Sequence, residues 1–575
     1  MSSPDPALQP LGSRLDAPPL RNVAQAFTSL LVELGVRQAF GVVGGAISQL
    51  YESLTHSDLQ IIHCRHEGGA AFAALEASFA SNLPVALFTT TGPGLTNALT
   101  GLQAARWEGG KVVVVSGATS AAQRGRWAVQ ETSEFTSPAG LYQRGEVFDF
   151  ACTLEHPAEL EVVAARLASG FARRGGFVAH LAMPIAQQTQ PCAPARPPLV
   201  RASVPACSDD EAMRLAALLS EKPFAIWVGF GARHASAEVR RLAEISGCPV
   251  MCSPRAKGIF PENHPQFIGV TGLGGHASVA RHLTEHRPAH VLVLGTRMGE
   301  PTSFWEPALV PEDAFIHVDV DRAAFGVAFP AARTVGIQAD VQEFLVALHR
   351  HLPARVPVRP GRSAPLIETP LSPRADGPIR PKFVVETIQR VVVEGSDAMV
   401  LAESGNAFAW ANNVLRFDQP HRYRVSVGYG SMGHATTGVV GAALARRGKA
   451  VALVGDGAML MNSEVNTAAQ YGAQAVWVVL NDGGYSMVEH GMRMLGFDPR
   501  ETDIPPADFA LIARGMGAEG TTVTREVDLE AALQEALASQ GPFVVDVRVD
   551  RSEPGPWVKR ARALMSQGVR RGGKS

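Results

Sequence analysis

Residues 451–487 give the clearest indication of the fold of the last third of this chain; their sequence is VALVGDGAMLMNSEVNTAAQYGAQAVWVVLNDGGYSM. A short apolar run ends at Gly455-Asp456-Gly457, a helical stretch follows, and a second apolar run ends at Asn481-Asp482. Strand, helix and strand of this length form a crossover between parallel strands of one sheet. We therefore expect Asp456 and Asp482 at the carboxyl ends of two strands, where doubly wound folds bind ligands.

The residue types at these strand ends suit a phosphate bound together with a divalent cation. Two carboxylates favour Mg²⁺, which keeps phosphate oxygens among its ligands. Glycine lets the backbone approach a phosphate, and the start of a helix offers N–H donors to an anion. GDG or NDGG alone is an ordinary turn sequence, but two such motifs, each directly after an apolar run, are more specific. We predict that Gly455, Asp456, Gly457, Ala458 and Asp482 form this site.

Short apolar runs alternate with helical stretches along the whole chain, which is typical of parallel sheets covered by helices. We predict an α/β protein with three doubly wound parallel-sheet domains at residues 21–186, 206–352 and 382–552. A polar linker at 187–205 and a Pro-rich connector at 353–381 separate them, and the tails at 1–20 and 553–575 are expected to be loose. The expected strands are 38–43, 61–64, 85–88, 111–115, 176–181, 224–228, 249–252, 291–294, 315–318, 399–402, 450–454, 475–480 and 543–547.

The composition of the 575 residues, 46% hydrophobic and 18% charged, is that of a well-packed protein rather than a disordered chain. A formal charge of −2 gives no electrostatic reason to expect nucleic acid or an anionic membrane as a partner. No secretory leader and no apolar stretch long enough to span a bilayer is evident, so we expect a cytoplasmic protein.

The six cysteines are too scattered for a disulfide framework. Cys248 and Cys252 could form half of a metal site, as could the cluster of His63, Cys64 and His66, but neither has a matching second half. We therefore interpret these residues as ordinary small or buried side chains.

At this point the chain resembles the thiamine diphosphate enzymes related to acetolactate synthase, pyruvate oxidase and pyruvate decarboxylase. Their diphosphate–magnesium motif begins with GDG and ends with two asparagines about one crossover later. The resemblance implies thiamine diphosphate and Mg²⁺ as cofactors, with Asp456 and Asp482 as side-chain metal ligands and Gly484 as a carbonyl ligand. Asp482 stands where the family usually has asparagine, and the intervening segment is one residue shorter than is common, but an oxygen ligand remains.

The segment HCRHEGGAAFAALEASFA, residues 63–80, resembles the HE-x-x-A segment of the same family. The resemblance implies that Glu67 is catalytic: it hydrogen-bonds the aminopyrimidine ring and so promotes removal of the proton at C2. A glutamate buried against apolar groups has a raised pKa and can share a proton in this way. Considered alone, Glu67 is better interpreted as a residue near the helix N-cap that the helix dipole stabilises, but the GDG–ND motif favours the catalytic role.

Three further loops of the first domain resemble loops around the cofactor. FTTTGPGLTNALTGL, residues 88–102, resembles a TGPG-x-TN loop, which implies that Gly92 and Asn97 lie beside the cofactor. GVVGG at 41–45 resembles a PGG loop, which implies that Gly44 and Gly45 also lie beside the cofactor. AVQET at 128–132 resembles an FQE segment, so Gln130 is a candidate to hydrogen-bond the bound intermediate, although valine replaces the aromatic residue. A turn followed by a helix cap would explain the TGPG sequence as well.

In the third domain, GYGSMGHATTGVVGAALA resembles a G-x-MG segment. It implies that the Gly430 carbonyl accepts from the pyrimidine amino group and that Met432 is the apolar wedge beneath the cofactor; simple core packing is the alternative for this methionine. Met487 matches an apolar pocket position, and Gly491 falls where acetolactate synthases carry an aromatic residue that restricts the pocket. Glu489 and His490 could be proton shuttles or solvent-facing helix residues.

The middle block, with KGIFPENHPQFIGVTG, VLVLGTRMGEP and IHVDVD, resembles the central domain that carries FAD in acetolactate synthases and pyruvate oxidase. No dinucleotide fingerprint appears, and Pro301 stands where an arginine would hold the carboxylate of an acceptor. The sequence therefore disfavours FAD, and it leaves room for a larger or uncharged acceptor.

The resemblance covers residues 21–550 and implies a homodimer or homotetramer, because sites in this family combine domains of different subunits. The expected reaction is decarboxylation of a 2-oxo acid with transfer of the acyl unit to a carbonyl acceptor. One alternative is a decarboxylase that releases an aldehyde, and another is a non-catalytic relative that binds a nucleotide or a partner. An NAD-dependent oxidoreductase is disfavoured because no strand–GxGxxG–helix unit appears.

Overall fold

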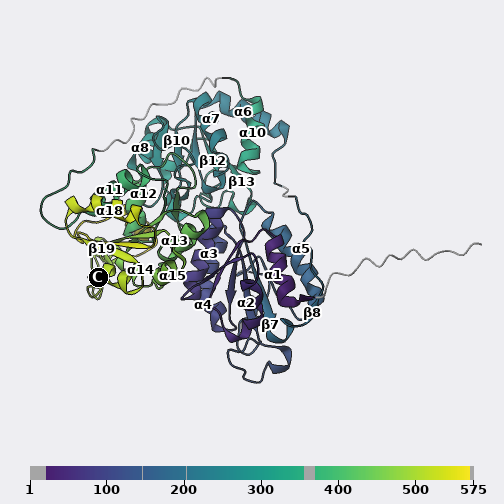
Figure 1. The fold of residues 1–575 in the computed structure, drawn as a ribbon. Helices are drawn as coiled ribbons and strands as arrows, with labels where there is room; N and C mark the ends of the chain where they lie inside the picture. The colour runs from purple at the N-terminus through teal and green to yellow at the C-terminus, as the bar shows by residue number, and fades with distance from the viewer. Residues whose placement is uncertain (1–20, 146, 202–203, 355–368, 570–575) are drawn as a thin grey trace, which may run out of the picture.

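The computed structural model describes residues 21–145, 147–201, 204–354 and 369–569, which form three α/β domains (Figure 1). Each domain contains one six-stranded sheet, and all strands within these sheets pair in parallel. Helices cover both faces of the sheets, so the predicted fold class is confirmed. The predicted tail at 1–20 and the basic end RRGGKS lie outside the described residues.

The first domain has strand order β3-β2-β4-β5-β7-β6, so the loops after β2, β3 and β4 meet at one edge of the sheet. These are the loops that carry GVVGG, HEGG and TGPG. Its strands are β2 Gln38–Gly41, β3 Gln60–His63, β4 Val85–Thr89, β5 Lys111–Ala118, β6 Phe150–Thr153 and β7 Phe177–Pro184. Its helices are α1 Val23–Glu33, α2 Ser48–Thr55, α3 Glu67–Ser81, α4 Pro93–Glu108 and α5 Leu160–Phe171.

The central domain has strand order β11-β10-β9-β12-β13-β14. Its strands are β9 Phe224–Val228, β10 Val250–Cys252, β11 Phe267–Val270, β12 His290–Leu294, β13 Ala314–Asp319 and β14 Thr334–Gln338. Its helices are α6 Asp209–Glu221, α7 Ser236–Ser246, α8 Ala277–His286, α9 Glu300–Ser303 and α10 Val341–His351. Cys248 and Cys252 are buried in its apolar core, as interpreted from the sequence.

The third domain repeats the topology of the first, with order β16-β15-β17-β18-β20-β19. Neighbouring strands β17 and β18 are joined by the crossover expected for residues 451–487. The strands are β15 Met399–Ala402, β16 Tyr423–Val425, β17 Ala450–Gly455, β18 Ala475–Asn481, β19 Glu519–Val523 and β20 Phe543–Arg548. The helices are α11 Pro381–Ile388, α12 Asn406–Val414, α13 His434–Arg446, α14 Asp456–Met459, α15 Glu464–Tyr471, α16 Ser486–Met494, α17 Phe509–Gly515, α18 Leu529–Ala538 and α19 Val558–Ser566.

Five strands of the six-stranded sheets were missing from the sequence-based expectation: β6, β11, β14, β16 and β19. All five are edge strands of their sheets. Strands β14 and β19 are largely half-exposed, and β16 has only three residues. Because edge strands need not be apolar on both faces, they lack the continuous hydrophobic run that marks a central parallel strand.

The polar linker at 187–205 contains a short strand that the sequence did not suggest. Strand β8, Pro191–Cys192, pairs antiparallel with β1, Arg21–Asn22, at the start of the first domain. Cys192 is buried in the core of that domain. The first part of the linker therefore belongs structurally to the first domain.

The expectation of a loose tail at 553–575 is wrong for its described part. Helix α19 forms, and the Trp557 indole before it is 2% exposed in the core of the third domain. The Lys559 ammonium lies 2.9 Å from the Glu306 carboxylate, and Arg560 pairs with Glu300. Two basic residues of this segment are thus held by acidic residues of the central domain. No helix among the described residues is long and apolar enough to cross a membrane.

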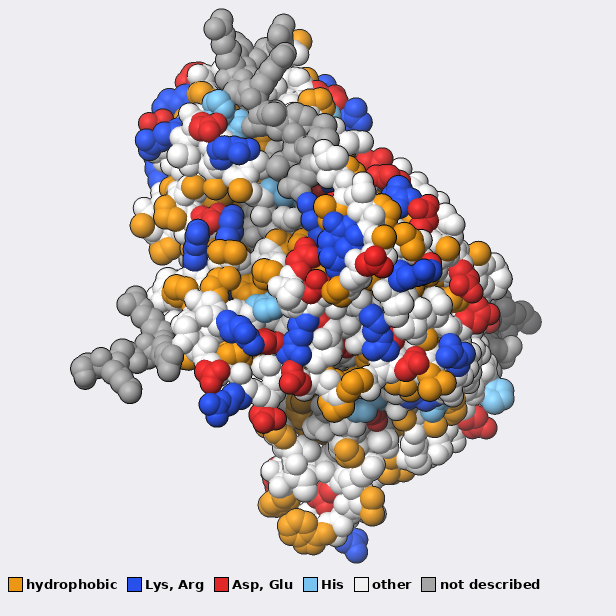
Figure 2. All heavy atoms as spheres, turned by 90° about the vertical axis from the view of Figure 1, so that its left-hand side faces the viewer, with side chains coloured by type: hydrophobic (Ala, Val, Ile, Leu, Met, Phe, Trp, Pro, Cys, Tyr) orange, Lys and Arg blue, Asp and Glu red, His pale blue; other side chains and the backbone are white. Residues whose placement is uncertain are grey.

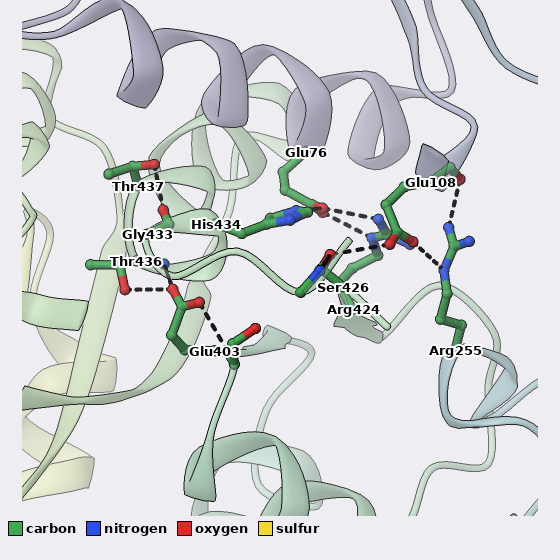
Figure 3. A network of polar contacts seen from close by, with 12 residues as sticks. Glu76, Glu108, Arg255, Glu403, Arg424, Ser426, Gly433, His434, Thr436 and Thr437 are labelled. Atoms are coloured by element: carbon green, nitrogen blue, oxygen red, sulfur yellow. Dashed lines mark hydrogen bonds and ion pairs between the residues drawn. The ribbon is translucent and has the colours of Figure 1, made fainter. Parts of the chain in front are cut away.

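Helices α3 and α13 join the first domain to the third by close backbone contact. Their sequences are rich in alanine and glycine, as such an approach requires. A Cβ atom at Gly441 would lie 1.9 Å from the Ala73 carbonyl oxygen, so no larger residue fits there. Next to this contact, Glu76 of α3 reaches Arg424 and His434 of the third domain (Figure 3).

The network around Glu76 is fully buried. Its carboxylate accepts from the Arg424 guanidinium at 2.8 and 2.9 Å and lies 2.7 Å from His434 Nε2. Burial alone would raise the pKa of Glu76, but Arg424 and His434 hold that pKa well below its usual value. The carboxylate is therefore ionised at neutral pH and bridges two domains.

We expect Glu76→Gln to lower the free energy of unfolding by about 3–5 kcal/mol, because it leaves the buried Arg424 without its counter-charge. Urea denaturation measures this, with the exposed Glu535→Gln as the matched control. A carboxyl with a depressed folded-state pKa stabilises above its ordinary value of 4.5 and loses that effect as pH falls. The gap between wild type and variant should accordingly shrink below that pH; a gap of under 1 kcal/mol at pH 7 would contradict this account.

Candidate cofactor site

A pocket of about 170 Å³ lies at the carboxyl ends of β15, β17 and β18 in the third domain. Eight of the residues proposed from the sequence line it together: Met432, Gly455, Asp456, Gly457, Ala458, Asp482, Gly484 and Met487. Gly430 is not among the lining residues; it lies in the turn before Met432, where its N–H donates to Ser426 Oγ at 3.3 Å. The crossover therefore assembles most of the expected half-site.

The two aspartates are fixed by backbone amides. Asp456 begins α14 directly after β17, and its carboxylate accepts from the N–H groups of Gly457 and Gly483, each at 2.7 Å. Asp482 accepts from the Gly484 N–H at 3.1 Å. Burial raises the pKa of both carboxyl groups, that of Asp482 to about 6, where the neighbouring Asp456 adds to the effect.

This donor set suits a divalent cation that brings further oxygen ligands of its own. Neither aspartate forms an ion pair within the described chain. No group of three or more His, Cys, Asp or Glu side chains that could hold a metal occurs in the described residues. If Asp456, Asp482 and the Gly484 carbonyl were its protein ligands, Mg²⁺ would have several coordination positions left, which it commonly fills with phosphate oxygens and water.

The start of α12 is a part of the pocket that the sequence reasoning missed. Ser404, Gly405, Asn406 and Ala407 line it, and their loop follows β15 just as GDG follows β17. Glu403 holds this loop: its carboxylate accepts from the N–H groups of Ser404 and Thr436, each at 2.9 Å (Figure 3). The first turn of a helix binds anions, so this end is suited to phosphate. In the sequence, this loop could have been found from the apolar run at 399–402, which is followed closely by Ser-Gly-Asn.

Two glycines leave open space in the pocket. A Cβ atom added at Gly405 or at Gly455 would meet no atom within 4 Å, although both residues line the cavity. By contrast, a Cβ at Gly457 would come within 2.8 Å of the Tyr485 ring, so that glycine serves packing. The space at Gly405 and Gly455, between two helix starts and two carboxylates, fits a phosphate and its cation.

Glu489 and His490 do not line the pocket. The Glu489 carboxylate pairs with Arg551 at 2.5 Å and with Arg493 at 2.6 Å, and His490 stacks on Trp557 with ring centroids 6.4 Å apart. The Glu489 side chain is mostly buried, so the solvent-facing alternative is wrong for this residue. Its role is to hold α16 against the segment after β20.

Glu67 and its neighbours assemble in the first domain. Glu67 is the first residue of α3, is 8% exposed, and accepts a hydrogen bond from Asn97 Nδ2 at 3.0 Å. The Gly44 Cα lies so near Thr90 that a Cβ there would come within 2.6 Å of the threonine Cβ. The loops after β2, β3 and β4 thus meet around one buried carboxyl group.

Gln130 lies on the long segment between β5 and β6, at the same sheet edge. Its side-chain oxygen accepts from Thr91 Oγ1 at 3.1 Å, and a Cβ at Gly92 would lie 3.0 Å from its carbonyl oxygen. Trp127 and Val129 beside it are 83% and 91% exposed. Figure 2 shows hydrophobic side chains at the lower tip of the molecule and along the left side of the face, with basic and acidic side chains interspersed among them.

The two groups of residues do not meet within one chain. None of the residues that line the Asp456 pocket comes from the first domain. Instead, the loop before Glu67 is bound to α15: the Glu464 carboxylate accepts from the N–H groups of Arg65 and His66, at 3.1 and 3.0 Å. The Glu67 half and the Asp456 half are therefore separate sites on this chain.

Glycines of the central domain are explained by packing. A Cβ at Gly229 would lie 2.2 Å from the Gly295 carbonyl oxygen, and one at Gly231 would lie 2.8 Å from the Gly295 Cα. These close contacts join the loops after β9 and β12. Because packing accounts for them, these glycines provide no independent support for a nucleotide such as FAD.

Three parallel-sheet domains, with a pocket at the strand ends of the third, define a multidomain α/β protein. Models of the thiamine pyrophosphate enzyme family match the chain in all three: the N-terminal TPP binding domain at residues 21–137, the central domain at 213–348 and the C-terminal TPP binding domain at 403–547. The chain belongs to the thiamine pyrophosphate enzyme family.

Relatives of the chain extend over nearly its whole length. It is 30% identical to an acetolactate synthase of Mycobacterium bovis, covering 91% of this chain and 87% of that protein. It is 27% identical to the acetolactate synthase isozyme 1 large subunit of Escherichia coli, covering 92% and 94%. A putative thiamine pyrophosphate-containing protein of Bacillus subtilis is 26% identical, with 93% of each covered.

Proposed function

We propose that this protein is a thiamine diphosphate- and Mg²⁺-dependent carboligase of acetolactate-synthase type. It would decarboxylate a 2-oxo acid and transfer the acyl unit to a carbonyl acceptor. The observation that carries the proposal is the pairing of Asp456 and Asp482 in one pocket beside the start of α12. Similarity to acetolactate synthases over about nine-tenths of the chain supports the type of reaction.

The residues of the pocket suggest how the cofactor is held. Asp456, Asp482 and the Gly484 carbonyl would bind Mg²⁺, while the amides at the starts of α12 and α14 would bind the diphosphate. Met432 and Met487 provide an apolar, adaptable surface for the rings. When bound, thiamine diphosphate supplies an electron sink for loss of carbon dioxide from a 2-oxo acid.

Glu67 would hold and move the proton at the aminopyrimidine ring, with Asn97 fixing its carboxyl group. Because Glu67 and Asp456 are separate on one chain, we propose a homodimer or homotetramer in which each complete site combines two subunits. The exposed Trp127 and Val129, next to Gln130, support this, since such side chains are typical of protein interfaces.

The acceptor is less constrained than in an enzyme that holds it by a guanidinium group. Pro301 lies at the start of α9, where its carbonyl accepts from the Leu273 N–H at 3.0 Å. No positive charge is available from this position. We propose that the acceptor is uncharged or larger than pyruvate, and that the central domain does not require FAD.

Product analysis tests the proposed reaction. The protein, loaded with thiamine diphosphate and Mg²⁺, is incubated with pyruvate alone and with pyruvate plus an aldehyde. We expect an acyloin that incorporates the added aldehyde. Free acetaldehyde as the sole product would instead support a decarboxylase. No consumption of any 2-oxo acid by protein that binds the cofactor would indicate a non-catalytic relative.

A further inference from the structure

A second, smaller cavity lies where the three domains meet. Phe79 and Asn82, at the end of α3, contribute from the first domain. Arg233 and Arg255 contribute from the central domain, and Arg424 from the third. The cavity shares no lining residue with the pocket around Asp456. Its volume is about 30 Å³, and the exposed Asn82 lies at its rim.

Most cations at this cavity have a carboxylate partner. Arg424 is bound by Glu76, Arg255 lies 3.0 Å from the Glu108 carboxylate, and Lys257 lies 2.7 Å from Glu262. Figure 3 shows Arg255 reaching from the central domain to Glu108 of the first. In each of these pairs the carboxylate neutralises the cation, so the three pairs add no net charge to the cavity.

Arg233 is the exception. Among the described residues no carboxylate lies within ion-pair distance of it, and the nearby Asp340 is taken by Arg174 at 3.5 Å. Burial, and then the guanidinium of Arg424, lower the pKa of Arg233 to about 10, so the side chain is still charged at neutral pH. One positive charge, on a half-buried side chain, therefore has no carboxylate partner among the described residues.

Arg424, which neighbours Arg233, has a buried hydrogen-bond donor without an acceptor among the described residues. Arg424 is 4% exposed, its Nε and Nη2 donate to Glu76, and its Nη1 has no acceptor within the described chain. Its guanidinium lies 3.7 Å from the centre of the Phe79 ring, and that of Arg233 lies 4.7 Å from the centre of the Phe230 ring. Buried donors are normally satisfied, and a guanidinium commonly binds an oxyanion.

We propose that this cavity binds a small oxyanion of the phosphate type, held by Arg233 and by the Nη1 group of Arg424. One water molecule needs roughly 10–15 Å³ by the same measure, so the cavity accommodates a few atoms and excludes a nucleotide. The bound anion would neutralise the surplus charge and link the central domain to the third. The site is independent of the proposed reaction.

The test uses protein saturated with thiamine diphosphate and Mg²⁺, so that the other phosphate-binding pocket is occupied. Radiolabelled inorganic phosphate is titrated by equilibrium dialysis, and the unfolding temperature is followed at constant ionic strength. Sulfate and adenosine monophosphate are the comparison arms. We expect one phosphate per chain, competition by sulfate, no competition by the nucleotide, and an unfolding temperature that rises with phosphate.

Arg233→Met should weaken phosphate binding by about tenfold or more, because it removes a charged hydrogen-bond donor. The same change at the exposed Arg240, which pairs with Glu244 on the surface, is the matched control. Arg233→Lys keeps the charge and should retain one phosphate with weaker affinity, which covers the case in which the methionine variant does not fold. Absence of phosphate from the wild type, or equal affinity in the Arg233 variants and the Arg240 control, would overturn the proposal.

Discussion

Replacing Glu67 by glutamine is expected to lower turnover by about 10²–10⁴-fold, which is the usual contribution of a positioned acid or base. The change keeps the size of the side chain and a carbonyl oxygen that can still accept from Asn97 Nδ2. It removes only the ability to share a proton. The cofactor should therefore still bind with nearly unchanged affinity, since phosphate and metal are held by another domain.

Consumption of a 2-oxo acid and binding of thiamine diphosphate are measured on the same preparation. Glu161→Gln, at an exposed position in the first turn of α5, is the matched control and should have wild-type turnover. Turnover of the Glu67 variant within twofold of the wild type would remove this carboxyl group from the mechanism. Loss of cofactor binding instead would mean that Glu67 positions the cofactor.

The sequence predicted the parts of the site that depend on local order along the chain. An apolar run, a glycine turn and an acidic residue place Asp456 and Asp482 at adjacent strand ends whatever the rest of the molecule does. Glu67 at the start of α3 follows from the same pattern. The loop at Ser404 was missed because it has the same geometry without a conspicuous acidic residue in the pocket.

What the sequence could not predict depends on contacts between distant segments. Helix α19 contains several basic residues and resembles a solvated tail, yet it is fixed by Glu300 and Glu306, about 250 positions earlier. Gly441 gives no local sign that it faces the Ala73 carbonyl. Edge strands such as β19 bury too little surface to show an apolar run. Contacts between distant segments and burial determine these features, and neither can be predicted from a few consecutive residues.

The two aspartates should respond differently to the same substitution. Asp456→Asn is expected to weaken cofactor binding by roughly 2–5 kcal/mol, because it removes a buried charge that Mg²⁺ would need. It also turns an amide group toward one of the Gly457 and Gly483 N–H donors, both of which now point at carboxylate oxygens. Asp482→Asn restores the residue usual in the family and keeps an oxygen ligand, so its affinity should remain within a few-fold of the wild type.

Titration of thiamine diphosphate at fixed Mg²⁺ measures both affinities, with the exposed Asp498→Asn as control. Equal losses for Asp456→Asn and Asp482→Asn would contradict the assignment of roles.

Mixing the two inactive variants tests whether a site is shared between subunits. A dimer of one Glu67→Gln chain and one Asp456→Asn chain has one intact site and one doubly defective site. Random reassembly of equal amounts should restore about a quarter of wild-type turnover, since half of the dimers are mixed and each has one of two sites. If both halves of a site came from the same chain, the mixture would stay as inactive as its components.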